Sequence, residues 1–207
     1  WHDAGHHGLT IAVNVSGVQF WQRGLVQTVA QVLADTGIDP QCLELEITES
    51  VLMRDADATM VTLQALKRMR VNISVDDFGT GYSSLSYLRR FPIDILKIDK
   101  SFTGNVTIDV ESAAIVKAIG ALARDLGLVT VAEGVETIEQ LEFFREQHCD
   151  RVQGLLFSAP RCVADISEML GARAAGQLQQ QGAIPQGDRN TDDVGQIPTQ
   201  ECARGAA

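Results

Sequence analysis

A chain of 207 residues with 45% hydrophobic residues can bury the core of one domain, which excludes a protein that is disordered throughout. Its net charge of −10 argues against holding DNA, RNA or an anionic membrane surface by bulk charge, so a bound phosphate ester would need metal ions as a bridge. The four cysteines are irregularly spaced without a C-x-x-C pair, which indicates free thiols in a reducing cytoplasm. No apolar stretch has the length of a membrane span, so we expect no membrane contact from this segment.

Six short runs of apolar and β-branched residues predict strands, and the segments between them have the periodicity of amphipathic helices. Gly37 and Gly127 fit helix ends, while Asp55 and Thr137 fit helix starts. This alternation requires a mainly parallel sheet, and we predict one α/β domain over residues 1–171. Residues 172–207 are rich in Gln, Gly, Pro and Asp and are predicted to be a disordered tail. The predicted strands are 9–15, 42–48, 71–76, 94–99, 128–133 and 151–157.

Polar side chains stand at the C-terminal end of the predicted strands, or near the start of the last one. They are Asn14, Glu46, Glu49, Asp76, Asp77, Lys97, Asp99, Glu133, Glu136 and Gln153. An open doubly wound sheet gathers ligands at one switch point, whereas a barrel collects residues from every strand around one axis. Because all six strands contribute, we favour a partial (β/α)8 barrel with about six of its eight units.

Asp76 and Asp77 form an unusual pair of adjacent carboxylates at a strand end. A solvated acidic turn is one interpretation, and a divalent metal site is the other, because two close carboxylates destabilise each other's charge. Together with Asn14, Glu46 and Glu133 they form a set of hard oxygen donors that suits Mg²⁺ or Mn²⁺, and a shared carboxylate would make a two-metal site.

Lys97 lies among these acids and can stay protonated to orient water or neutralise phosphoryl oxygens. The other interpretation of Lys97 is that it forms a structural ion pair with Asp99 or a neighbouring acid. Hydrolysis of a phosphodiester is the reaction that two metal ions and a lysine support best.

Six short motifs contain these polar residues. They are residues 14–16 (NVS), 46–49 (EITE), 76–85 (DDFGTGYSSL), 97–99 (KID), 133–136 (EGVE) and 153–154 (QG). In the order and spacing of these motifs, over roughly residues 12–160, the chain resembles the EAL-domain family. The resemblance implies a (β/α)8 barrel that hydrolyses cyclic di-GMP to the linear dinucleotide with two Mg²⁺ or Mn²⁺ ions.

The resemblance also implies roles for individual residues. Metal-site residues would be Asn14, Glu46, Asp76, Asp77 and Glu133, with Lys97, Asp77 and Glu133 acting in catalysis. Glu136, Gln153 and Asp99 would belong to the pocket near metal or substrate. Glu49 would hold the loop of residues 78–85, with Phe78, Gly79, Thr80 and Gly81, which couples metal binding to a homodimer formed through this loop and the following helix.

The sequence also departs from the family pattern. The Glu-Ala-Leu signature and a nearby substrate-binding arginine should precede Asn14 by several tens of residues, so we expect two barrel strands before position 1 and little activity from residues 1–207 alone. Gly17, Leu155 and Ala159 replace the family's common residues. An inert EAL-like module that binds cyclic di-GMP or a protein is the alternative function. We expect a cytoplasmic location, and a longer parent protein could carry a membrane anchor.

Overall fold

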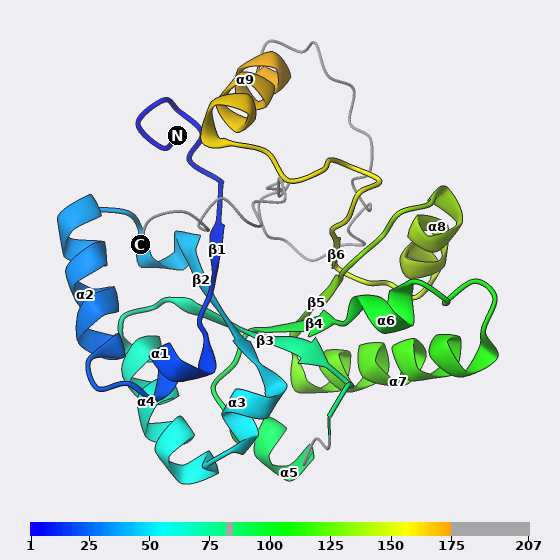
Figure 1. Ribbon diagram of the computed structural model, residues 1–207, viewed down its shortest axis with the longest axis horizontal. Coiled ribbons are helices and arrows are strands. Elements are labelled where there is room, and N and C mark those ends of the chain that lie inside the picture. The colour runs from blue at the N-terminus through cyan, green and yellow to red at the C-terminus, as the bar shows by residue number, and fades with distance from the viewer. Residues whose placement is uncertain (82–84, 175–207) are drawn as a thin grey trace.

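The computed structural model describes residues 1–81 and 85–174 and shows one curved sheet surrounded by helices (Figure 1). Its six strands are parallel and stand side by side in chain order. A doubly wound sheet would reverse its strand order at a switch point, so the sequential order confirms the barrel-type prediction. The strands are β1 (Ile11–Asn14), β2 (Leu43–Thr48), β3 (Asn72–Phe78), β4 (Ile95–Ile98), β5 (Val129–Ala132) and β6 (Arg151–Val152).

The longer helices lie on the outside of this half-barrel, and short helices follow several strand ends (Figure 1). Asp55 and Thr137 cap helix starts with their side chains, and Gly37 and Gly127 end helices in the left-handed conformation, as predicted. The helices are α1 (Gly17–Trp21), α2 (Leu25–Thr36), α3 (Glu49–Met53), α4 (Ala56–Arg68), α5 (Leu85–Leu88), α6 (Lys100–Thr103), α7 (Val110–Leu126), α8 (Ile138–Glu146) and α9 (Val163–Ala174), with a 3-10 turn, η1 (Pro40–Cys42), before β2.

The sheet has an apolar outer face and a polar inner face. In β2, Leu45 and Ile47 belong to the apolar core shared with the helices, while the alternate residues Glu44 and Glu46 are also buried. Glu44 lies 3.9 Å from Arg151 of β6, which is four strands away in the sheet. A contact across so many strands requires the sheet to curve, so the buried acids line the inside of the half-barrel.

The last strand is shorter than predicted. The sequence predicted residues 151–157 as extended, but β6 ends at Val152. Beyond it the Gln153 N–H still donates to the Ala132 carbonyl of β5 (2.9 Å), but the next bonds go to the loop after β5. The Val135 N–H donates to the Gln153 carbonyl (3.0 Å), and the Leu156 N–H donates to the Val135 carbonyl (3.1 Å). These two hydrogen bonds turn the chain around Val135 and end the ladder.

The C-terminal helix α9 lies beside the N-terminal segment (Figure 1), where the Trp1 indole N–H donates to the Ser167 hydroxyl at 2.8 Å. The helix extends to Ala174, three residues past the predicted end of the domain. The rest of the predicted tail, residues 175–207, lies outside the described residues. Among the helices of residues 1–81 and 85–174, none is both long and apolar enough to cross a membrane.

Candidate metal centre

An irregularity in β3 places two consecutive carboxylates on one side of the sheet. Val75 and Phe78 pair with Leu96 and Ile98 of β4, so two residues of β3, Asp76 and Asp77, stand opposite the single residue between those partners. This is the arrangement of a β-bulge, and Asp77 adopts a left-handed backbone (φ 54°). Side chains alternate in a regular strand, so the bulge is what brings both carboxylates together.

Glu133 completes this acidic cluster from the next strand end but one. It follows β5 directly, and one ligand oxygen from each of Asp76, Asp77 and Glu133 lies within 4.8 Å of the others. Asn14 stands opposite Glu46 in the register of β1 and β2, so these two predicted donors lie side by side at the same edge of the sheet. The donors that the structure brings together are therefore hard oxygen atoms, which suit Mg²⁺ or Mn²⁺ rather than zinc.

Lys97 lies at the centre of the cluster with only 1% of its surface exposed. Its Nζ is 2.6 Å from both Glu46 and Glu133 and 3.1 Å from Asp76. Burial lowers the pKa of Lys97, but the three carboxylates outweigh it and raise the pKa above that of a free lysine. The ammonium therefore stays charged, and its partners are these three acids, whereas Asp99 caps α6 by accepting the Ser101 N–H (2.9 Å).

One lysine does not neutralise the cluster. Burial raises the pKa of Glu133 to about 7, against the attraction of Lys97 and with the repulsion of Asp76. Burial also raises the pKa of Asp77, helped by the charges of Asp76 and Asp99. Two carboxyl groups that resist ionisation side by side have the electrostatics of a cation site, because a divalent ion would supply the missing positive charge.

A second layer of contacts holds Glu133. The Gln153 amide donates to the Glu133 carboxylate at 2.8 Å, so this predicted pocket residue reaches the cluster. The residue after it must be glycine, because a Cβ on Gly154 would lie 2.1 Å from the Val135 carbonyl oxygen. The close approach brings Gln153 within reach of Glu133.

A family model described as EAL domain matches residues 1–160. The chain belongs to the EAL-domain family. The curated relative MucR of Pseudomonas aeruginosa, a bifunctional diguanylate cyclase/cyclic di-GMP phosphodiesterase, is 51% identical over 160 residues, which are 77% of this chain and 23% of MucR. The chain thus spans about a quarter of the length of that relative.

Two solved structures share the fold of this EAL domain. The PaMucR phosphodiesterase, in complex with c-di-GMP, has a TM-score of 0.78 and 49% identity, and the match covers 80% of this chain and 67% of that one. BlrP1 of Klebsiella pneumoniae, in complex with manganese and c-di-GMP, has a TM-score of 0.69 and 31% identity over 75% of this chain and 41% of that one.

Glu49 attaches the loop after β3 to the start of α3. This buried carboxylate, the first residue of α3, accepts the Gly79 N–H at 3.1 Å. Gly79 has a left-handed backbone (φ 97°), and a Cβ there would lie 2.9 Å from the Phe102 ring. Phe78 is the last residue of β3 and is buried, so the loop begins one residue later than predicted, with Thr80 and Gly81 exposed. Glu136 is also exposed.

Sequence reasoning did not single out Gln140 of α8. Its side chain is buried and contacts the backbone of Glu136, Thr137 and Gly104. The available signal was the spacing Thr137-x-x-Gln140, which is that of a capping box at a helix start.

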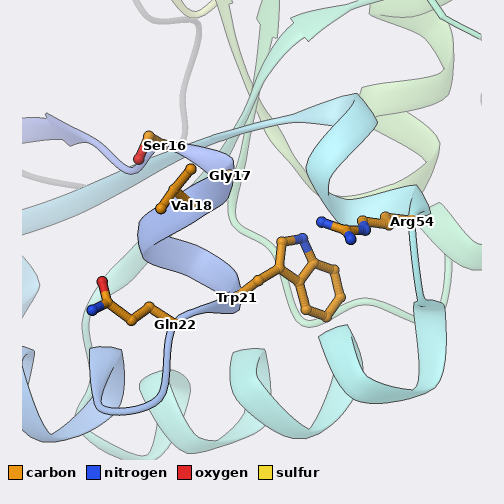
Figure 2. A pocket seen from close by; sticks show the side chains of 6 residues that line it. All are labelled: Ser16, Gly17, Val18, Trp21, Gln22 and Arg54. Atoms are coloured by element: carbon orange, nitrogen blue, oxygen red, sulfur yellow. The ribbon is translucent and has the colours of Figure 1, made fainter.

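A separate hollow of about 660 Å³ lies on α1 and beside the end of α3 (Figure 2). The Arg54 guanidinium stands 5.6 Å from the centroid of the Trp21 ring. The lining side chains include no carboxylate, so this hollow lacks the charged ligands that the cluster of Asp76, Asp77 and Glu133 offers. The lining residues are Ser16, Gly17, Val18, Trp21, Gln22 and Arg54.

Proposed function

We propose that this EAL domain hydrolyses cyclic di-GMP to the linear dinucleotide pGpG with two Mg²⁺ or Mn²⁺ ions. The observation that carries the proposal is the cluster of Asp76, Asp77 and Glu133 around the buried Lys97. The activity in the name of MucR and the ligands of PaMucR and BlrP1 support the same substrate and a divalent metal.

The donor set assigns the ion-binding residues. Asp76, Asp77 and Glu133 would hold the ions, with Glu46 and Asn14 at the neighbouring strand ends. When bound, two such ions act as Lewis acids that activate a water and offset the charge of the phosphodiester. Other residues of this chain would stabilise charge and orient the ligands.

Lys97 keeps its charge inside the cluster, so its ammonium can donate to a phosphoryl oxygen as negative charge develops there. Gln153 keeps the Glu133 carboxylate oriented by donating to one of its oxygens. Glu136 is exposed at the end of the same loop and would meet the ligand from the solvent side.

The proposal is tested on the protein with the Glu-Ala-Leu segment in place, by following pGpG chromatographically with Mg²⁺, with Mn²⁺ and with EDTA. Asp76→Asn should lower turnover by several orders of magnitude, because it removes a charged metal ligand. Lys97→Ala should lower turnover more than it weakens Mn²⁺ binding, measured by calorimetry. The exposed Asp57→Asn and Lys117→Ala are matched controls and should behave as wild type.

Turnover that is insensitive to EDTA would contradict the metal assignment. If Lys97→Ala abolished Mn²⁺ binding while Asp76→Asn left it intact, the two roles would have to be exchanged. Binding of cyclic di-GMP without any turnover would favour the alternative of an inert receptor.

We also propose a homodimer formed through the loop of residues 78–85 and α5. The hydrogen bond from Gly79 to Glu49 supports it, because it gives the loop a fixed attachment next to the bulge that carries the cluster. Light scattering after size exclusion should give twice the chain mass for the wild type and a shift toward monomer for Glu49→Ala. A cytoplasmic location fits the free thiols of Cys42, Cys149 and Cys162.

A further inference from the structure

The loop that carries Glu133 and Glu136 lies against α6, the helix that follows Lys97 and Asp99. Gly134 in this loop has a left-handed backbone (φ 68°), and a Cβ there would lie 2.7 Å from the Cβ of Lys100. Two strand ends that each supply site residues, those of β4 and β5, therefore meet in close contact. Contact alone leaves two loops free to slide, so their relative position needs directional bonds.

Gln140 supplies such bonds to both loops. Its Oε1 accepts the N–H groups of Glu136 (2.7 Å) and Thr137 (3.1 Å), and its Nε2 donates to the carbonyl of Gly104 (3.4 Å), which ends α6. The side chain is only 6% exposed, so these bonds compete little with water. One amide thus links the loop after β5 to the helix after β4.

The residue type distinguishes this link from an ordinary helix cap. In a capping box the third helical residue is Glu or Gln, and either accepts the N–H of the cap residue. A glutamate would also suit the positive helix start, but it has no hydrogen to donate. Only the amide of glutamine satisfies the Gly104 carbonyl as well.

We infer that Gln140 is a positioning residue of the metal centre: it fixes the loop of Glu133 and Glu136 relative to α6 and so holds Glu133 in line with Asp76 and Asp77. The geometry of this role comes from the three hydrogen bonds, and its purpose in catalysis rests on the proposed function. Outer residues that orient metal ligands typically contribute about 10- to 100-fold in metal affinity.

The test compares Gln140→Glu with the wild type, in the same protein as the turnover assay. The variant keeps the acceptor for Glu136 and Thr137 and loses the donor to Gly104. We expect Mn²⁺ affinity, measured by calorimetry, to fall about tenfold or more, while the thermal midpoint in EDTA stays within a few degrees of wild type. The matched control is Gln147→Glu, the same substitution at the far end of α8, which should bind Mn²⁺ as wild type.

A Gln140→Glu variant that binds Mn²⁺ with wild-type affinity would overturn the inference, whatever its thermal midpoint. If Gln140→Glu does not fold, the uncharged Gln140→Met is read in the same way. If the wild type does not hydrolyse cyclic di-GMP but its Mn²⁺ affinity responds to Gln140→Glu, the proposed function fails and the positioning role stands. If turnover is present and Mn²⁺ affinity does not respond, the positioning role fails alone.

Discussion

Glu133→Gln should change how the stability of the metal-free protein depends on pH. The pKa of Glu133 is raised from its ordinary 4.5 to about 7 in the folded state, so the folded protein holds this proton more tightly than the unfolded chain does. Its contribution to stability is therefore fully present below pH 4.5 and is lost as the pH rises through 7. At about 1.4 kcal/mol per pH unit, the interval corresponds to roughly 3 kcal/mol of unfolding free energy.

Glutamine keeps the shape of the side chain, and its carbonyl oxygen can still accept from Lys97 and Gln153, but it does not titrate. The unfolding free energy of Glu133→Gln should therefore fall less than that of the wild type between pH 5 and 8, by an amount that approaches roughly 3 kcal/mol. Urea unfolding in EDTA at several pH values measures the difference. Glu142→Gln, with a side chain 55% exposed, is the control and should keep the wild-type slope. An unchanged slope in Glu133→Gln would refute the assignment of this buried titration.

Three further predictions concern the same region. Mn²⁺ needs the ionised Glu133, so the apparent affinity for Mn²⁺ should fall about tenfold per pH unit below 7. Calorimetry in buffers of different ionisation enthalpy should show the release of a proton on binding. Constant affinity between pH 5.5 and 7.5 would contradict this. Gly154→Ala should destabilise the protein by about 1–3 kcal/mol or more in the same urea assay, since the new Cβ would overlap the Val135 carbonyl. The control Gly171→Ala has open space around it in α9 and should be neutral or stabilising. Asp77→Ala should be less stable than Asp77→Asn by about 1 kcal/mol, because both remove the charge but asparagine tolerates the left-handed backbone better; equal midpoints would argue against strain at the bulge.

Much of the architecture is local information and could be predicted from the sequence. The alternation of apolar runs and helical periodicity determined a parallel sheet, and the caps at Asp55, Thr137, Gly37 and Gly127 depend on residues within one turn of the chain. Polar residues at strand ends predicted a barrel, because parallel strands bring their C-terminal ends to one edge. The adjacent acids Asp76 and Asp77 indicated the site, because they stand at such a strand end.

Tertiary structure decided what depends on partners distant in the chain. The bulge at Asp76 and Asp77 exists only against the register of β4. Strand β6 ends at Val152, shortly before Gly154 meets the backbone of Val135. The partners of Lys97 come from three different strand ends, and no spacing in the sequence says which acids will lie within 3.1 Å of its ammonium. Gln140 has the sequence signature of a helix cap, and only the packing of α6 against the next loop gives its amide a second partner. These contacts form because the curved sheet brings together residues that are far apart in the sequence. A local pattern along the chain does not specify that curvature.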